Sequence, residues 1–416
     1  MKVELGFGKT KVPMEIAADR ILGTLTPNPV PTAICGEAEV KRALAAPIGT
    51  PRLRDIVKPG EKIAIVTSDI TRPMPSKQVM PLLLEELSQA GIALTDVTVV
   101  FALGSHRKHT AAEQKGLVGD EVYSQVRCVD SDGSDCIHLG VTSHGTPMDI
   151  FRTVAEADRR ICLGNIEYHY FAGYSGGVKA ILPGTSTREA IQANHSKMVL
   201  EAARAGEMAN NPVRRDIDEV LSFVPVDFIL NVVLDEHKTI IKAVAGHPVK
   251  AHRVGCQFLD RFYKVRIKEP ADIVVVSAGG HPKDINLYQA QKALDNAKYA
   301  VKEGGIIILV ASCKEGFGEV VFENWMREAE APNDLIAKIQ QQFVLGGHKA
   351  AAIALVLNKC RIYVVSDLEA DEVRQIFMKP YSRVQEALDD ALAEFGTNSK
   401  VMIMPYGGST LPEVIV

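Results

Sequence analysis

The chain has 416 residues and a formal net charge of −4; 46% of the residues are hydrophobic and 24% are charged. This composition is typical of globular proteins and excludes disordered, collagen-like and disulfide-scaffold classes. Because lysines and arginines are dispersed along the chain, we expect no nucleic-acid partner. The seven cysteines form no C-x-x-C pair, and neither a signal-peptide pattern nor a membrane-spanning apolar run is present. We therefore expect a cytoplasmic protein with reduced thiols and no membrane partner.

Short β-branched runs alternate with helical stretches along the chain. This alternation predicts an α/β fold, and the near-continuous apolar runs predict parallel strands covered on both faces. The predicted strands are Lys62–Ser68, Val97–Leu103, Arg160–Gly164, Asp227–Leu234, Asp272–Ala278, Gly305–Ser312, Arg361–Ser366 and Lys400–Pro405. The predicted helices between them include Pro75–Gly91, Tyr288–Glu303 and Ser382–Gly396.

A charged, proline-containing segment, Lys264–Ala271, precedes a fresh strand and helix and marks the predicted domain boundary. We expect an N-terminal α/β domain of residues 1–268 and a C-terminal α/β domain of residues 269–416. Each should contain a mostly parallel Rossmann-like sheet with helices on both faces, and the active site should lie in the cleft between the domains. The sequence leaves open whether the last strand and the glycine-rich tail, about the last 15 residues, return to the first domain.

Four of the predicted strands end in loops that carry Asp, Arg or His. In open α/β sheets, ligands bind beyond the carboxyl ends of the strands. A helix cap or a solvated loop would explain any one of these ends, whereas four together favour a binding site. The residues concerned are Asp69, Thr71, Arg72, His106, His109, Glu167, His169, His281, Lys283 and Asp284.

The segment Phe171–His195 is the densest in candidate functional residues. Its Ser175-Gly176-Gly177 run gives a backbone that a ligand can approach closely. Lys179 follows at once, and it could pair with a phosphate or act as an amine nucleophile. A solvated surface lysine is the alternative at this position.

Two further patterns contain histidines. Ser186-x-x-Glu189 is a capping-box pattern, which predicts a helix that begins near Ser186 and has His195 at its end. His106-x-x-His109 has a spacing that a metal ion could use. The structural alternative for His195 is a favourable charge at the end of a helix. The alternative for His106 and His109 is that they simply stand at the start of a helix.

A polar cluster in the C-terminal part could bind an anion. A helix that begins near Asp284 would place Tyr288 and Lys292 four residues apart on one face. Gln289 would add a donor, and Arg72 could add a bidentate fork to the same carboxylate. An ordinary amphipathic helix is the alternative.

Taken together, these loops supply histidines, a lysine, an arginine and amide donors. That inventory fits proton transfer at a small carboxylate substrate. Two separate bases suit racemisation, which needs a base on each face of the substrate. Histidine is the natural choice because its ordinary pKa is close to neutral.

The order and spacing of five motifs resemble the nickel-dependent lactate racemase family over nearly the whole chain. Members of that family are 2-hydroxyacid racemases or epimerases that use a nickel-pincer nucleotide, a pyridinium-3,5-bisthiocarboxylic acid mononucleotide carrying nickel. The motifs are Asp69-x-Thr71-Arg72-Pro73, Gly104-x-His106-Arg107, His169 with Ser175-Gly176-Gly177-x-Lys179, Asn194-His195, and Pro282-Lys283-Asp284-Ile-Asn286-Leu-Tyr288-Gln289.

The resemblance implies an isomerase that acts by reversible hydride transfer to this cofactor. It implies that Lys179 holds the cofactor covalently and that His195 is the protein ligand of Ni(II), a metal that imidazole suits. His106 and His169 would be the catalytic acid–base pair, one for each enantiomer. The expected cofactor contacts are Asp69, Ser175, Gly176 and Gly177. The expected substrate contacts are Arg72, Tyr288, Gln289 and Lys292. His348 is a weaker candidate for a pocket residue.

The resemblance also bears on substrate and partners. It implies a small 2-hydroxy acid as substrate and cofactor maturation enzymes as partners; the oligomeric state is not predicted. Lactate-specific members pack a Trp of the C-terminal domain against the substrate, whereas the only Trp here is Trp325 and the region around Ala350–Ala352 is small. A wider pocket would admit a larger 2-hydroxy acid such as malate.

Two alternative functions stay open at this point. One is a metal-dependent lyase that acts on a hydroxy acid, which would need a cluster of His or carboxylate ligands. The other is a non-catalytic protein that binds the cofactor or a hydroxy acid, which would not need both His106 and His169.

Overall fold

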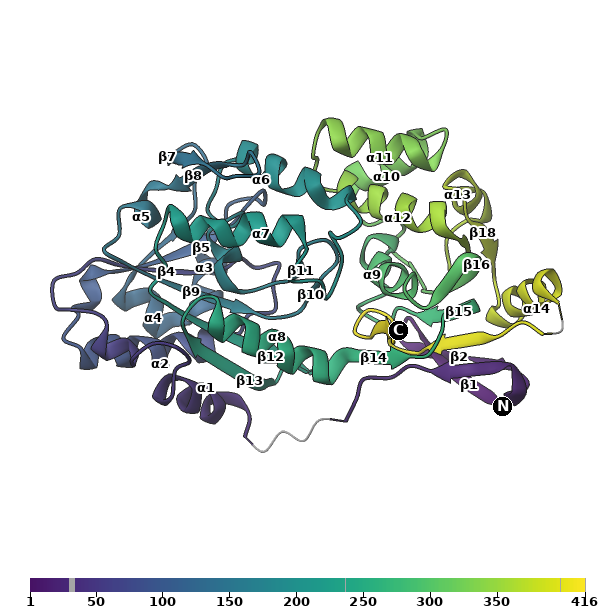
Figure 1. Ribbon diagram of the computed structural model, residues 1–416, viewed down its shortest axis with the longest axis horizontal. Helices are drawn as coiled ribbons and strands as arrows, with labels where there is room; N and C mark the ends of the chain where they lie inside the picture. Colours follow the sequence, from purple (N-terminus) through teal and green to yellow (C-terminus); the bar gives the residue numbers. More distant parts are fainter. Residues whose placement is uncertain (30–33, 236, 397, 416) are drawn as a thin grey trace. The chain divides into compact units, whose positions relative to one another are not determined.

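The computed structural model describes residues 1–29, 34–235, 237–396 and 398–415. The chain divides into two compact units, whose elements are labelled in Figure 1. The middle unit comprises Val30–Asp260, and the terminal unit comprises Met1–Pro29 together with Arg261–Val416. Each unit has its own sheet.

The middle unit contains a six-stranded sheet in the order β13-β12-β9-β4-β5-β6. All neighbouring strands are parallel except β12 and β13, which are antiparallel. The chain adds β5 and β6 on one side of β4 and then β9 on the other, so the strand order reverses between β4 and β9. The strands are β4 (Ile63–Ser68), β5 (Val97–Ala102), β6 (Arg127–Asp130), β9 (Arg159–Asn165), β12 (Phe228–Leu234) and β13 (Ile240–Gly246).

Helices pack against the middle sheet because its strands and its helices both present apolar stripes. In α2, Val79, Leu83 and Leu87 recur every four residues and are fully buried in the same core cluster as Ile65 and Val99 of the sheet. The same cluster includes residues of α1 (Gly36–Ala45), α2 (Ser76–Gln89), α3 (Ala111–Val118) and α4 (Asp120–Gln125). The short helix η4 (Gly177–Ala180) contacts β4 and β9.

Smaller elements complete the middle unit and carry several candidate residues. Two antiparallel pairs occur, β7 with β8 and β10 with β11. These elements are β7 (Cys136–Val141), β8 (Pro147–Phe151), α5 (Arg152–Ala155), β10 (Tyr168–His169), β11 (Gly173–Tyr174), α6 (Arg188–His195), η5 (Ser196–Val199), α7 (Pro212–Asp218) and α8 (Lys250–Tyr263), the last of which ends just beyond the unit boundary.

The terminal unit contains a second six-stranded sheet, in the order β18-β17-β16-β15-β19-β3, and all of its neighbours are parallel. The β1–β2 hairpin and α14 pack on one face in a single core cluster. Helices α9 and α12 contact β16 of the same sheet. The strands are β3 (Ile21–Thr24), β15 (Ala271–Ser277), β16 (Val301–Val310), β17 (Arg361–Val365), β18 (Lys379–Tyr381) and β19 (Val401–Met404).

The other elements of the terminal unit surround this sheet. The β14–β20 pair is parallel and two-stranded. These elements are β1 (Lys2–Phe7), β2 (Thr10–Glu15), β14 (Lys264–Ile267), α9 (Leu287–Ala297), α10 (Val320–Glu328), α11 (Pro332–Gln341), α12 (Gly347–Lys359), α13 (Ala370–Gln375), α14 (Val384–Phe395) and β20 (Leu411–Val414).

The predicted α/β class with parallel sheets is confirmed, and every predicted strand has a counterpart. The structure differs in how the chain is divided. Residues 1–29, expected in the N-terminal domain, belong to the terminal unit, because β3 adds to the sheet beside β19. The tail also stays in that unit, since β20 pairs with β14.

Two helix starts lie further along the chain than the sequence predicted. Helix α6 is capped by Thr187, whose side chain accepts a hydrogen bond from the amide of Ala190, whereas the Ser186 hydroxyl donates back to the Ile181 carbonyl. Helix α9 begins at Leu287 rather than near Asp284. The side chain of the preceding Asn286 caps it.

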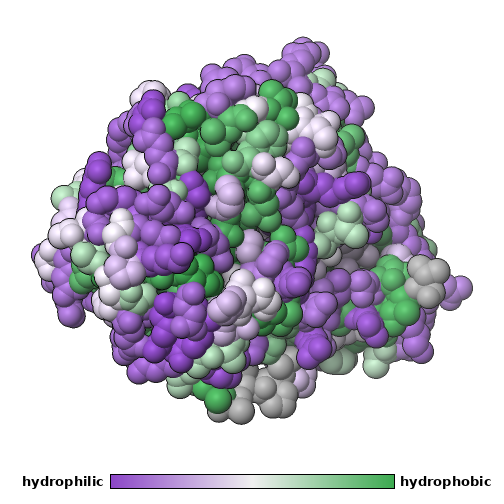
Figure 2. All heavy atoms as spheres, turned by 60° about the vertical axis from the view of Figure 1, so that its left-hand side comes forward, coloured by the Kyte–Doolittle hydropathy of each residue, from purple (hydrophilic) through white to green (hydrophobic). Residues whose placement is uncertain are grey.

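The exposed face shown in Figure 2 is mainly hydrophilic, with smaller hydrophobic areas between the polar residues. Within the part of the chain that the structure describes, every helix is too short or too polar to cross a bilayer.

Candidate functional site

Three loops at the carboxyl edge of the middle sheet bring predicted site residues together. Asp69 follows β4, His106 follows β5, and His169 lies in the hairpin that follows β9. Strand β4 lies between β5 and β9, so these loops are neighbours. This edge is also where the strand order reverses, which is the usual ligand position in an open α/β sheet.

Asp69 and His106 form a hydrogen-bonded pair at this edge. Asp69 is buried, and one of its oxygens contacts Nδ1 of His106. Its other oxygen accepts hydrogen bonds from the amide and hydroxyl of Thr71, at 3.1 and 2.7 Å. Burial alone would raise the pKa of Asp69, but the hydrogen bond and charge of His106 outweigh it and lower that pKa. The carboxylate is therefore ionised, and it orients the imidazole.

His169 lies half-buried among aromatic rings. Its Nδ1 accepts a hydrogen bond from the amide of Ala172 at 3.3 Å. The centroid of the Phe171 ring is 4.5 Å from that of His169 and 4.8 Å from that of His195, so Phe171 packs against both histidines. Burial, followed by the positive charges of Lys179 and Arg72, holds the pKa of His169 well below its ordinary value. His169 is consequently neutral at pH 7.

Lys179 lies in η4, within the same electrostatic environment. Burial, and after it the positive charges of Arg72 and Arg214, lower the pKa of Lys179 to about 7, while Glu167 and Asp69 oppose the shift. Within the described residues, no hydrogen bond or ion pair engages its Nζ. An amine that is about half uncharged at pH 7 can act as a nucleophile, whereas a solvated surface lysine is almost fully charged there.

His195 is buried at the end of α6, and its Nδ1 lies 2.9 Å from Oδ1 of Asn194. Asn194 in turn donates from Nδ2 to the carboxylate of Asp216 and to the carbonyl of Val213. A chain of hydrogen bonds therefore leads from Asp216 in α7 through Asn194 to the His195 ring.

Arg72 presents an exposed guanidinium beside these groups. Its Nη1 makes a 3.4 Å hydrogen bond to the hydroxyl of Thr71, and among the described residues no carboxylate pairs with it.

His109 has a structural role, because its ring is fully buried and both ring nitrogens are hydrogen-bonded. Its Nδ1 lies 2.7 Å from Asp130, and its Nε2 accepts from the amide of Ile70. His106 and His109 therefore do not form a metal site together.

The Ser175-Gly176-Gly177 run is held by internal contacts. The Ser175 hydroxyl donates to the Asn165 carbonyl and accepts from the amide of Glu167, so it closes the turn after β9. Gly176 and Gly177 have φ values of +76° and +62°, which favour glycine. A Cβ on Gly177 would lie 3.1 Å from the His252 ring, so close packing also requires glycine there.

The predicted substrate residues Tyr288, Gln289 and Lys292 lie in α9 of the terminal unit. Tyr288 is half-buried and stacks under the ammonium of Lys349, whereas Gln289 and Lys292 are exposed. His348 is buried near the start of α12 and accepts a hydrogen bond from the amide of Gly346.

The residues expected to mark a wider pocket are part of the helical core of the terminal unit. Ala350–Ala352 are fully buried in α12. Trp325 is also buried, and a Cβ on Gly347 would lie 2.7 Å from its ring, so Trp325 packs on the first turn of that helix.

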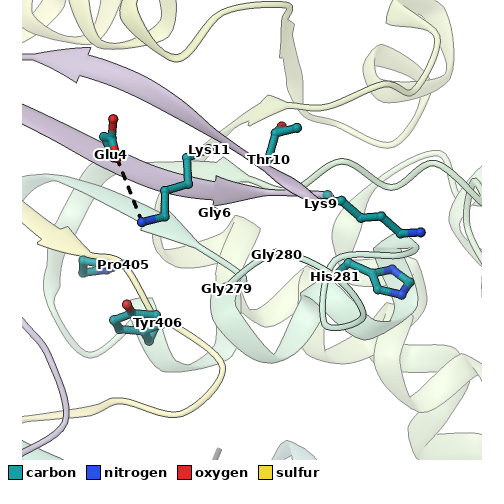
Figure 3. Close-up of a pocket in the computed structure, with 11 residues that line it drawn as sticks. Glu4, Gly6, Lys9, Thr10, Lys11, Gly279, Gly280, His281, Pro405 and Tyr406 are labelled. Carbon is teal, nitrogen blue, oxygen red and sulfur yellow. Dashed lines mark ion pairs between the residues drawn. The ribbon is translucent and has the colours of Figure 1, made fainter.

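A pocket of about 570 Å³ opens in the terminal unit (Figure 3). It is lined by the β1–β2 hairpin, by the Gly279–His281 turn after β15, and by Pro405 and Tyr406 after β19. Lys11 pairs loosely with Glu4 there, at 3.9 Å. None of the residues assigned a catalytic, cofactor or substrate role lines this pocket.

Sequence reasoning missed two residues that support the site, Arg214 and Asn231. Arg214 is fully buried and donates to the carbonyls of Ala172 and Tyr174, which hold the β10–β11 hairpin. Asn231 accepts from the amide of Gly177 at 2.7 Å. Asn231 was detectable as the one polar residue inside the apolar run FILNVVL, whereas no local pattern marks Arg214.

The chain is similar to known proteins over nearly its whole length. The family model described as the lactate racemase N-terminal domain matches residues 7–206, and the model described as the lactate racemase C-terminal domain matches residues 267–412. A lactate racemase of Thermoanaerobacterium thermosaccharolyticum is 36% identical over 98% of both chains. A lactate racemase of Lactiplantibacillus plantarum is 31% identical over 97% of this chain and 98% of that one.

Solved structures show the same similarity. The lactate racemase apoprotein from Thermoanaerobacterium thermosaccharolyticum matches with a TM-score of 0.90 and 35% identity, covering 99% of this chain and 100% of that one. A Thermotoga maritima protein matches with a TM-score of 0.65 at 19% identity, covering 91% and 98% of the two chains, which supports the fold alone.

Proposed function

Because the chain belongs to the lactate racemase family, we propose that this isomerase racemises or epimerises a 2-hydroxy acid, with lactate as the first substrate to test. One observation carries the proposal. At a single edge of the middle sheet, the chain gathers a lysine whose pKa is about 7, an Asp–His pair and a neutral histidine.

The residues of the middle unit fit the nickel-pincer nucleotide that the motifs imply. Lys179 would hold it covalently, since half of its amine is uncharged near pH 7. His195 would complete the coordination of Ni(II), because imidazole is a suitable ligand for nickel. When bound, the cofactor supplies a reversible acceptor for the hydride of the substrate α-carbon. Asp69, Ser175, Gly176 and Gly177 would surround it, the last three through backbone rather than side chains.

The two catalytic histidines have different hydrogen-bond partners, and each would act on one enantiomer. Asp69 accepts at Nδ1 of His106, so the neutral ring carries its proton there and has a lone pair on Nε2. His169 accepts at Nδ1 from Ala172, so its neutral ring carries the proton on Nε2. His106 would therefore take the substrate hydroxyl proton on Nε2, and the imidazolium so formed would return that proton to the same oxygen when the carbonyl is reduced again. His169 would take and return the proton for the opposite enantiomer.

Arg72 would bind the substrate carboxylate. Its guanidinium is exposed and, within the described residues, unpaired with any carboxylate, so a bidentate interaction is open to it. Tyr288, Gln289 and Lys292 remain proposed substrate contacts. A larger 2-hydroxy acid such as malate remains the alternative substrate to lactate.

The proposal is tested on protein produced together with the cofactor maturation enzymes. Intact mass and metal analysis should show an adduct on Lys179 and about one nickel per chain. The Lys179→Ala variant should lack the adduct, whereas Lys41→Ala, at an exposed position of α1, should retain it. The loaded wild type should abolish the optical rotation of L-lactate or of another 2-hydroxy acid in a screened panel.

The histidine pair is tested in the same assay. His106→Ala and His169→Ala should each stop racemisation. His138→Ala is the matched control, because His138 also contacts a carboxylate, that of Asp149, but is exposed. Activity of both variants near the wild-type level would contradict the two-base mechanism. Absence of adduct and nickel, under conditions that load a known family member, would favour a metal-dependent lyase or a non-catalytic binding protein.

A further inference from the structure

Asn194 is fully buried, and two hydrogen-bond acceptors fix the orientation of its amide. Its Nδ2 lies 2.8 Å from Oδ2 of Asp216 and 3.2 Å from the carbonyl oxygen of Val213. A carboxylate and a carbonyl only accept, so both hydrogens of the Asn194 amide must point toward them. The amide oxygen consequently points the other way.

Asp216 is itself held as an acceptor. The hydroxyls of Thr142 and Thr146, the ammonium of Lys197 and the amide of Asn194 all donate to its two buried oxygens. Thr142 donates to Oδ1 and the other three donors converge on Oδ2, so the orientation of the carboxylate is fixed. His144 and Glu219 also lie close to Asp216.

The oxygen of Asn194 determines the tautomer of His195. It lies 2.9 Å from Nδ1 of the His195 ring. Because an amide oxygen can only accept, Nδ1 must carry the hydrogen, and in the neutral ring the lone pair then resides on Nε2.

We propose that Asp216 and Asn194 are positioning residues that hold His195 in its Nδ1–H tautomer and so make Nε2 the atom that ligates nickel. The nickel part of this inference rests on the proposed function, whereas the tautomer follows from the hydrogen bonds of the apoprotein alone. Metal-bound histidines generally donate their other ring N–H to an outer partner, and loss of that partner typically costs 10–100-fold in metal affinity.

The tautomer is measured first, on the full-length apoprotein labelled with ¹⁵N-histidine. Long-range ¹H–¹⁵N correlation distinguishes a protonated from an unprotonated ring nitrogen, and the His195 signals are those absent from the His195→Gln spectrum. We expect a protonated Nδ1 and an unprotonated Nε2. The Asn194→Leu variant, similar in size but without the amide, should lose this preference. An unprotonated Nδ1 in the wild type, or an unchanged pattern in folded Asn194→Leu, would overturn the proposal.

A milder variant guards against misfolding. Asn194→Ala removes the amide oxygen without adding bulk, so the preference for a protonated Nδ1 should be lost in this variant too. Glu219→Gln is the matched control. Glu219 lies beside Asp216 but bonds to Ser143, so this change should leave the tautomer as it is in the wild type.

Nickel retention is measured next, on protein matured with the cofactor enzymes. Asn194→Leu should keep the organic adduct on Lys179 but lose nickel to a chelator at least about tenfold more readily. Glu219→Gln should hold nickel as the wild type does. If the wild type carries nickel and Asn194→Leu retains it equally, the positioning role is wrong while the proposed function stands. If the wild type takes up no nickel under loading conditions, the proposed function fails. The role of Asp216 and Asn194 in nickel binding then fails too, whichever tautomer of His195 is observed.

Discussion

Lys179 should react with an amine reagent at a pH where ordinary lysines do not. With a pKa of about 7, about half of its amine is uncharged at pH 7. A lysine with the ordinary pKa of about 10.4 is only about 0.04% uncharged at that pH, so the reactive fractions differ about a thousandfold. Trace labelling of the apoprotein with acetic anhydride between pH 5 and 10, followed by peptide mass spectrometry, gives the midpoint for each lysine. A midpoint near 7 is expected for Lys179.

The same experiment separates the causes of the shift. Burial contributes more than the charge of Arg72, which is itself exposed, so Arg72→Leu should raise the Lys179 midpoint by less than about one pH unit. Arg152→Leu, a change at another exposed arginine of the middle unit, should leave it unchanged. A wild-type midpoint close to 10 would refute the argument, because it would mean that water reaches this amine freely.

Three further predictions concern stability, measured by urea unfolding. The pKa of the Lys179 amine is lower in the folded than in the unfolded protein. Between about pH 7 and 10 the unfolded state therefore binds more protons, and the free energy of unfolding of the wild type rises with pH. The stability of Lys179→Met should exceed that of the wild type most at pH 6 and least at pH 10. Gly177→Ala should lower the free energy of unfolding by about 1–3 kcal/mol, because the new Cβ would contact the His252 ring and the backbone φ of +62° disfavours alanine. Gly116→Ala, which has open space around it, should raise the free energy of unfolding by up to about 1 kcal/mol. His109→Ala should lower the free energy of unfolding by about 1–3 kcal/mol, because it removes a fully buried ring and its hydrogen bond to Asp130. The nickel content of matured protein should stay unchanged, and nickel loss in this variant would contradict the structural role of His109.

The strands were predictable because burial on both faces requires continuous apolar runs. A short run of this kind, such as KIAIVTS, is typical of a buried parallel strand. Strand β13 was not predicted, because it is an antiparallel edge strand whose register with β12 is irregular near Leu234. The division of the chain was not predictable either. Whether Ile21–Thr24 joins one sheet or the other depends on pairing with Val401–Met404, and no local pattern encodes a partner so far along the chain.

The candidate site was predictable to the extent that it follows strand ends. Asp69, His106 and His169 stand directly after strands, so the strand-end rule places them at one edge. His109 stands at a strand end too, but its ring is buried in hydrogen bonds and serves the fold. The rule identifies where ligands bind, and only the hydrogen bonds tell a reactive histidine from a structural one.

His195 illustrates what the strand-end rule omits, since it comes from a helix and not from a strand end. Consecutive residues of a helix point about 100° apart. Asn194 can therefore reach the buried carboxylate of Asp216 while its neighbour His195 faces the ring of Phe171. The pair Asn194-His195 thus supplies a ligand and the group that orients it in two adjacent positions. Neither residue type alone indicates this relation in the sequence, because the direction of the amide is determined by Asp216, which lies on another helix.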